Sequence, residues 1–234
     1  VTGRTADLKV ALRSPRMLGM AALTAFFVSV NWGVYIWAIA NDQALDGALG
    51  YYINPLFSVF LGAVLLREKL DRLQWAAVAL AALAVIVLTV AEGRLPLIAL
   101  LLMLSWGGYA FCKRRLPIGP NQGFFLEVAI LTVPALAWLI WLAARGEGAF
   151  MAGVPWDTWM LLCAGIVTAA PLILYVNGAK LLRLSTIGIL QYIAPTLIML
   201  VAVFIFEEPF GQARIIAFPM IWAALILYSI ALFR

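Results

Sequence analysis

The chain has 234 residues, of which 65% are hydrophobic and only 12% are charged. Soluble domains are about half apolar, so a soluble fold could not bury this surplus, and the chain belongs in a lipid bilayer. The net charge of +5 does not indicate a nucleic-acid binder, because the basic residues stand at the ends of apolar stretches, which is the pattern of membrane topology.

The apolar stretches are long and continuous, which predicts transmembrane helices rather than a barrel. After a polar, basic segment over residues 1–16, we expect eight spans, at about 17–40, 47–66, 73–91, 95–112, 123–144, 156–179, 186–206 and 212–233. Each holds roughly 18–24 residues, enough to cross a hydrocarbon core of ~30 Å at ~1.5 Å per residue. Because the chain does not begin with Met, we expect it to be a piece of a longer protein.

The basic residues predict how the spans are oriented. One set of loops and ends holds thirteen of the 16 Lys and Arg residues, and the opposite set holds only Arg94, Arg145 and Arg214. Positively charged loops stay in the cytoplasm. We therefore expect a multi-pass protein of which both ends of this chain are cytoplasmic.

A weak internal repeat appears when the chain is shifted by 140 positions. Tyr52, Ile53, Pro55 and Glu68 then match Tyr192, Ile193, Pro195 and Glu208 without a gap. The matched prolines fall in the second and seventh spans, so the two copies would cross the membrane in opposite senses. Inverted repeats of this kind are the architecture of many secondary transporters. The alternative is two unrelated apolar helices that share a proline by accident.

The repeat predicts a five-helix unit and therefore ten helices in the whole fold. Residues 1–91 would be the last three helices of the first repeat, with its first two helices missing, and residues 92–234 would be the five helices of the second repeat. The fold class we expect is thus an all-α polytopic membrane protein, with inverted five-helix repeats of which eight transmembrane helices are present.

Two prolines near the middle of their spans indicate where a solute could bind. A proline within a helix frees the carbonyl four residues earlier, and a bare carbonyl in a bilayer needs a partner. The expected substrate or cavity residues are Asn31, Trp37, Tyr51, Tyr52, Asn54, Pro55, Tyr175, Asn177, Gln191, Tyr192 and Pro195. The alternative is a packing kink, with the asparagines only bridging helices.

Glu127 is the one acidic residue well inside an expected span. An intramembrane carboxylate is a functional hypothesis by default, and Glu127 could carry a coupling proton or bind a cationic group. The alternative is a structural ion pair with Lys113 or Arg114. Lys113 could itself meet an anionic substrate, or it could extend to the lipid surface.

Several motifs resemble those of RarD-type permeases, which form part of the EamA branch of the drug/metabolite transporter superfamily. They are Asn31-Trp32, Ile36-Trp37-Ala38, the run from Leu49 to Leu56, the run from Gly165 to Thr168, Pro171-Leu172, the run from Leu182 to Thr186, and the run from Gln191 to Leu197. The resemblance implies ten helices in two inverted halves, in the bacterial inner (plasma) membrane. It also implies a permease for small organic solutes. Glu127 falls where members of this group tend to carry a Glu.

We therefore expect a permease that moves a small organic metabolite or drug-like solute by alternating access and secondary transport, with proton coupling as one option. The alternatives are a channel-like protein or a non-transporting membrane scaffold. An enzyme is not expected, because the chain has no histidine, no Asp well inside a span and no HExxH motif. We expect no catalytic residues, no cofactor and no metal. The expected partners are a small-molecule substrate and the lipid bilayer, with no nucleic acid. Whether the protein forms a homodimer is left open by the sequence.

Overall fold

The computed structural model describes residues 11–67, 69–148, 155–179 and 192–232, and these residues form helices with no β-strand among them. The helices are α2 (Pro15–Ala40), α3 (Ala44–Leu66), α4 (Arg72–Glu92), α5 (Leu97–Arg115), α6 (Pro120–Arg145), α7 (Pro155–Ala179), α9 (Ile193–Phe204) and α10 (Gln212–Leu232). Each begins and ends close to an expected span, except that the first part of the span expected at 186–206 lies outside the described residues.

Within the described residues, five helices are long and apolar enough to cross a membrane. They are Pro15–Ala40, Ala44–Leu65, Arg72–Glu92, Gln122–Arg145 and Gln212–Ala231, and Leu97–Lys113 and Ile193–Phe204 are shorter apolar helices. The chain is therefore an all-helical, multi-pass membrane protein.

Short polar signals set the ends of the helices. Asp71 accepts a hydrogen bond from the Gln74 backbone N–H while the Gln74 side chain accepts one from the Asp71 N–H, and this reciprocal pair starts α4. The same helix ends at Gly93, whose φ of 65° is a conformation that glycine adopts without strain. At the start of α2, the Ser14 side chain accepts a hydrogen bond from the Met17 N–H, and Pro15 is the first residue of the helix.

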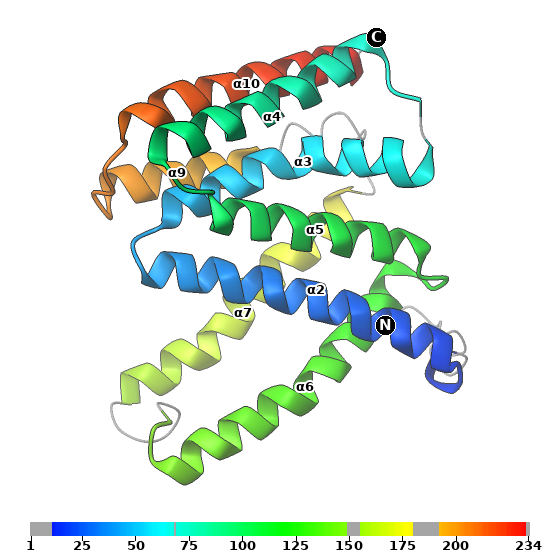
Figure 1. Cartoon of the computed structure of the whole chain (residues 1–234). Coiled ribbons are helices and arrows are strands. Elements are labelled where there is room, and N and C mark those ends of the chain that lie inside the picture. The colour runs from blue at the N-terminus through cyan, green and yellow to red at the C-terminus, as the bar shows by residue number, and fades with distance from the viewer. Residues whose placement is uncertain (1–10, 68, 149–154, 180–191, 233–234) are drawn as a thin grey trace.

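Helix α3 lies at the centre of the bundle. It packs against α5 and α9, while α4 packs along α10 and α2 packs on α5 and α6. In Figure 1, α4 and α10 form one edge of the molecule and α6 and α7 the opposite edge, with α2, α3 and α5 between them. The main apolar core, which includes Leu49, Leu88 and Phe218, lies among α3, α4, α9 and α10.

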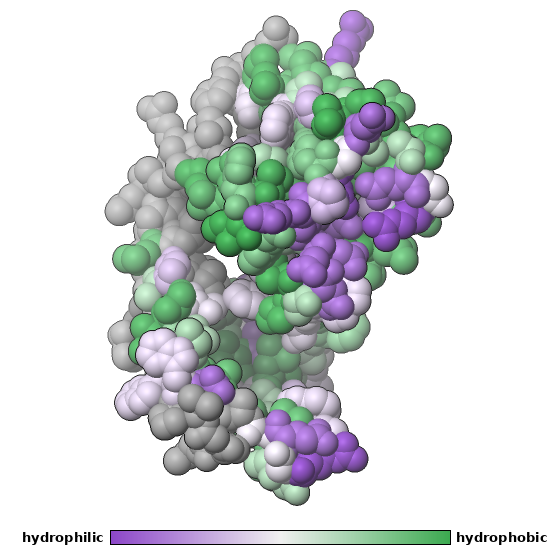
Figure 2. All heavy atoms as spheres, turned by 90° about the vertical axis from the view of Figure 1, so that its left-hand side faces the viewer, coloured by the Kyte–Doolittle hydropathy of each residue, from purple (hydrophilic) through white to green (hydrophobic). Residues whose placement is uncertain are grey.

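Large apolar side chains also lie on the outward surface of the helices. Val90 of α4 is 76% exposed and Ile140 of α6 is 68% exposed. Such a surface is unfavourable in water but matches the hydrocarbon of a bilayer. Hydrophilic residues gather instead at the end of the bundle where α10 begins, with apolar residues around them (Figure 2).

Gly50 allows α3 to approach α5 closely. A Cβ atom at this position would lie 3.0 Å from the Cα and carbonyl oxygen of Ala99 and from the Cβ of Leu102. Backbone atoms cannot move aside without moving the helix, so any larger residue would force α3 and α5 apart.

We expect Gly50→Ala to lower stability by about 1–3 kcal/mol, the usual cost of overpacking. Gly33→Ala is the matched control, because Gly33 lies within α2 and a Cβ there would meet nothing within 4 Å. That control should raise stability slightly, since Ala favours a helix more than Gly does. Thermal unfolding of both variants in detergent, followed by size-exclusion chromatography, checks the prediction. Equal midpoints for the two variants would contradict the close contact.

Candidate functional site

Helix α3 contains Pro55 and is joined to two neighbouring helices through Tyr51 and Asn31. The Tyr51 hydroxyl donates to Oδ1 of Asn31 on α2 at 3.1 Å. Nδ2 of Asn31 donates to the carbonyl of Leu102 and to Oγ of Ser105, both on α5 and both at 3.0 Å. Asn31 is fully buried, so one amide joins α2, α3 and α5 inside the bundle.

Tyr52 reaches the opposite side of α3, toward α9 and α10. Its hydroxyl lies 2.7 Å from Oγ1 of Thr196. The Thr196 hydroxyl donates its single proton to the Tyr192 carbonyl at 2.7 Å, so Tyr52 is the donor between the two hydroxyls. The Tyr52 ring also meets Phe218 and Trp222 edge-on. Adjacent tyrosines thus connect α3 to both sides of the bundle.

Asn54 is buried beside Pro55 and has an unused acceptor. Within the described residues its Oδ1 has no hydrogen-bond partner. Leaving such an atom buried and unpaired costs roughly 1–3 kcal/mol. Asn54 can therefore accept a hydrogen bond from a solute or from water. Pro195 is buried in the first turn of α9, where the missing N–H of a proline needs no partner.

Not all of the remaining site residues predicted from the sequence lie beside α3 in the structure. Trp37 is 52% exposed near the end of α2. Tyr175 and Asn177 lie in α7, but their side chains are outside the part of the chain that the structure describes, and so is Gln191. Of the others, Asn31 is joined to Tyr51 on one side of α3. On the other side Tyr52 is joined through Thr196 to Tyr192, in the part of α9 that also holds Pro195. Asn54 and Pro55 follow Tyr52 in α3 itself.

Glu127 and Lys113 form a second polar cluster between α5 and α6. Nζ of Lys113 lies 2.7 Å from Oε1 of Glu127, and the Tyr109 hydroxyl donates to Oε2 at 3.3 Å. The Glu127 side chain is 3% exposed and that of Lys113 is 21% exposed. A buried carboxylate needs such a partner, because removing one charge would leave the other unpaired at a cost of several kcal/mol.

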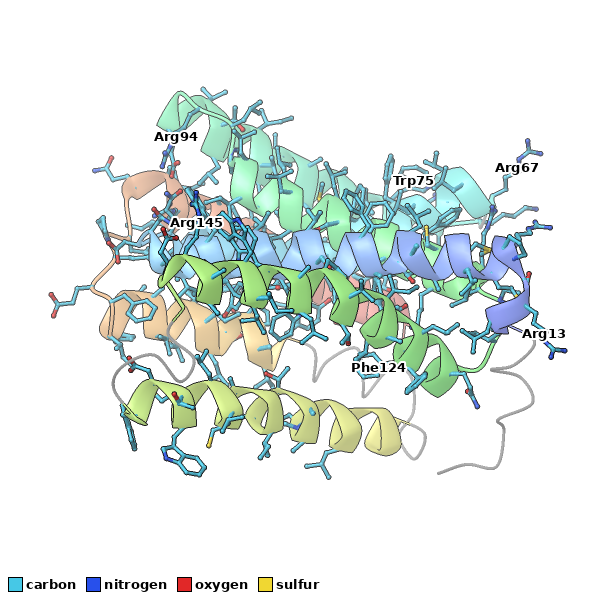
Figure 3. All side chains as sticks on the ribbon, turned by 90° about the horizontal axis from the view of Figure 1, so that it is seen from below. Arg13, Arg67, Trp75, Arg94, Phe124 and Arg145 are labelled. Atoms are coloured by element: carbon cyan, nitrogen blue, oxygen red, sulfur yellow. The ribbon has the colours of Figure 1, made fainter. Side chains whose placement is uncertain are left out.

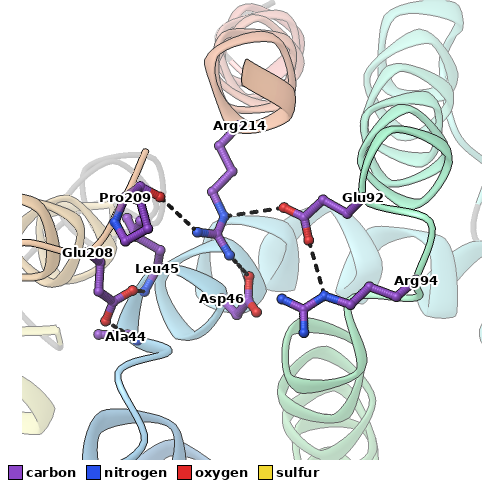
Figure 4. A network of polar contacts seen from close by, with 8 residues as sticks. All are labelled: Ala44, Leu45, Asp46, Glu92, Arg94, Glu208, Pro209 and Arg214. Carbon is purple, nitrogen blue, oxygen red and sulfur yellow. Dashed lines mark hydrogen bonds and ion pairs between the residues drawn. The ribbon is translucent and has the colours of Figure 1, made fainter. Parts of the chain in front are cut away.

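A third polar cluster joins the two halves of the chain at the end where α3 begins. The buried carboxylate of Glu208 accepts hydrogen bonds from the backbone N–H groups of Ala44 at 2.6 Å and of Leu45 at 2.9 Å (Figure 4). These are the first N–H groups of α3, which have no partner within the helix. A negative charge is favourable there because the helix dipole is positive at this end.

Arg214 of α10 adds ion pairs beside Glu208. Its guanidinium lies 2.9 Å from Asp46 on α3 and 3.6 Å from Glu92 on α4 (Figure 4). Glu92 also pairs with Arg94 at 3.6 Å. We call the contacts of Glu208, Arg214, Asp46 and Glu92 the closing network, because they join α3 and α4 to the segment that runs from α9 into α10.

Several of these residues were not predicted from the sequence. Ser105, Thr196 and Tyr109 are single polar residues in apolar helices, and no local pattern marks them. Arg214 did carry a signal, since it is one of only three basic residues expected at its face of the membrane. A basic residue that departs from the charge pattern is a candidate for a specific ion pair.

Comparison with known proteins identifies the family. The model of the EamA-like transporter family matches residues 6–90 and 95–230. Protein RarD of Streptomyces exfoliatus is 40% identical over 95% of this chain and 70% of that protein. An uncharacterized transporter of Vibrio cholerae is 39% identical over 94% and 72%, and protein RarD of Escherichia coli is 36% identical over 94% and 75%. No solved structure matches significantly.

Both the family and these relatives are described as transporters, or bear the RarD name, and none is described as an enzyme. The family match covers nearly the whole chain, and it includes the residues of the three polar clusters except Glu92 and Arg94. The chain therefore belongs to the EamA-like transporter family, as a RarD-type permease rather than an enzyme.

Proposed function

We propose that this protein moves a small organic solute across the bacterial inner membrane by alternating access. The observation that carries the proposal is the arrangement along α3: buried polar side chains flank Pro55, and the closing network holds the start of the same helix. A permease needs a polar site inside the membrane and a contact that closes one face while the other is open.

The solute would bind around Tyr51, Tyr52 and Asn54, beside Tyr192 and Pro195. Each tyrosine hydroxyl is engaged with another helix, so a solute that takes over either hydrogen bond would weaken the contact between those helices. The unpaired Oδ1 of Asn54 would accept from a hydroxyl, amine or amide group. This chemistry fits a small polar metabolite or a drug-like molecule.

The topology we propose has eight transmembrane helices in this chain, as part of a ten-helix fold of two inverted repeats, with residues 1–91 in the first and 92–234 in the second. Arg13 and Arg67 lie at one end of the bundle, and Arg94 and Arg145 lie at the other (Figure 3). This separation supports the sorting of the loops into two sets. The end with more basic residues, and with it both ends of the chain, would be cytoplasmic.

Glu127 is the residue we propose for coupling to protons. Its ion pair with Lys113 is buried, so protonation of Glu127 would release Lys113 from its partner. A charge change at this point would alter the contact that joins α5 to α6. The pair would thereby link proton binding to a movement of the helices.

We expect Glu127→Gln to reduce proton-driven transport at least ~10-fold, because an amide cannot carry the coupling proton. The protein, expressed from its complete gene, would be reconstituted in liposomes with an imposed pH gradient. Currents would be recorded across a panel of metabolites and antibiotics. Glu147→Gln is the matched control, because Glu147 is exposed outside the helices and pairs only at 3.9 Å with Arg145.

Three other results would each change the proposal. Saturable currents that survive Glu127→Gln would support a permease in which Glu127 has no part in proton coupling. Currents far above carrier rates would indicate a channel. The absence of any solute-dependent signal from folded protein would favour a scaffold.

The closing network predicts that Glu208 keeps the face of the protein at the start of α3 closed. We expect Glu208→Gln to speed the opening of this face about tenfold, since hydrogen bonds to a charged group contribute roughly 1.5–3 kcal/mol. The readout is the rate at which a membrane-impermeant maleimide labels Ala48→Cys, introduced into a protein whose natural cysteines are replaced. Ala48 is fully buried one turn into α3. Glu207→Gln is the control, because Glu207 stands next to Glu208 in the chain and its side chain is exposed. Equal labelling rates in the two variants would rule out the network as a gate.

A further inference from the structure

An apolar groove runs between α3, α4 and α5 on the outside of the bundle, away from the polar clusters. It has a volume of about 310 Å³ and is lined by apolar side chains alone, among them Phe57 and Phe60 of α3, Val78 and Ala82 of α4, and Leu100 and Met103 of α5. Pockets for small ligands measure roughly 300–1,000 Å³, so the groove is large enough to hold part of a molecule.

Small residues create this groove. Ala81 and Ala82 leave space along α4. On α5, Gly107 lets the Phe57 ring lie directly over the helix, because a Cβ atom there would come within 2.6 Å of that ring. Phe57 stacks on Phe60 with the ring centroids 6.2 Å apart. The aromatic pair therefore forms a fixed wall of the groove.

The length of the groove is close to the depth of one leaflet of a membrane. Along α4 it extends from Val78 to Ile86, which is ~12 Å at ~1.5 Å per residue. Half of a ~30 Å hydrocarbon core is ~15 Å. The residues from Val78 to Ile86 are the middle of α4, so in a multi-pass protein the groove lies at the depth of lipid tails rather than of water.

The charges at one end of the groove indicate the kind of lipid. Arg67 follows Phe60 by about two turns, and Arg72 precedes Val78 by less than two turns, so both lie roughly 10 Å beyond the groove. Trp75, 48% exposed, stands at this same end with Arg67 (Figure 3). Tryptophan and basic residues are the usual anchors at the head-group level.

The local charge balance favours an anion there. The segment 67–72 holds Arg67, Lys69 and Arg72 against Glu68 and Asp71. Asp71 is already engaged in the cap of α4. Clustered basic residues beside a membrane surface attract anionic lipids, at about 1 kcal/mol for each charge near the surface.

We propose that this groove binds one acyl chain of an anionic phospholipid, with the head group against Arg67 and Arg72. The bound lipid would lie between α3 and α4 on the side away from the solute site. Because lipid binding needs no transport, this inference can be tested independently of the proposed permease activity.

The test is native mass spectrometry of the protein from its complete gene, with palmitoyl-oleoyl phosphatidylglycerol and phosphatidylcholine added in equal amounts. Wild type should retain phosphatidylglycerol in preference to phosphatidylcholine. Ala82→Phe, which fills the groove, should reduce the retained lipid at least fivefold. Ala76→Phe is the matched control, because this exposed alanine lies on α4 outside the groove, and it should retain lipid as wild type does.

A double variant, Arg67→Gln with Arg72→Gln, separates the head group from the tail. It should abolish the preference for phosphatidylglycerol while total lipid retention persists. A second measurement on wild type does not depend on any variant folding. Phosphatidylglycerol with a photoreactive group in its acyl chain should crosslink to the peptides that contain Phe57, Phe60 or Val78.

The following results would overturn the proposal. Ala82→Phe and Ala76→Phe could retain lipid equally, or the crosslinks could fall outside α3, α4 and α5. The wild type could also be a dimer that only Ala82→Phe separates, with no change in bound lipid, in which case the groove is an interface between copies of the chain. Unchanged selectivity in the arginine double variant would refute the assignment of the head group.

Discussion

The hydrogen bonds from the start of α3 to Glu208 are the contact on which the arrangement of the two halves depends. A helix that begins inside a membrane protein exposes N–H groups that neither water nor lipid can satisfy. Glu208 supplies both oxygens to two of them, across 164 and 163 residues of sequence. The contact fixes the start of α3 against the end of α9, and the ion pairs of Arg214 add α4 and α10 at the same place.

From that fixed end, α3 runs through the middle of the bundle and meets a different environment at each turn. Gly50 permits close contact with α5, Tyr51 and Tyr52 bind helices on opposite sides, and Pro55 follows directly after Asn54. A proline inside a helix weakens it locally because a backbone hydrogen bond is missing. The helix is therefore held at its start and weakened near its middle. A bend at Pro55 would move the part of α3 near Glu208 the least and the part beyond Pro55 the most.

The sequence was sufficient for the helical membrane class and for the approximate helix bounds, because long apolar runs have few other structures available in a bilayer. It also predicted Asn31, Tyr51 and Tyr52 as candidate site residues, the two tyrosines because they lie near Pro55 in the same span. It could not supply their partners. Asn31 meets Ser105 across 74 residues and Tyr52 meets Thr196 across 144 residues, and a single sequence carries no periodic signal for contacts between distant helices. The ion pair of Glu127 was easier to foresee, since Lys113 lies only 14 residues away in the preceding helix.

That difference in sequence separation has a mechanical consequence. The pair of Glu127 and Lys113 joins α5 to α6, two helices that are consecutive in the chain. The closing network joins α3 and α4 to α9 and α10, which belong to opposite ends of the chain. If the two halves move apart as rigid bodies, the long-range contacts must break, whereas a pair within one helical hairpin can persist. The closing network is therefore suited to be the barrier between two states, and the Glu127 pair is suited to respond to protons within either state.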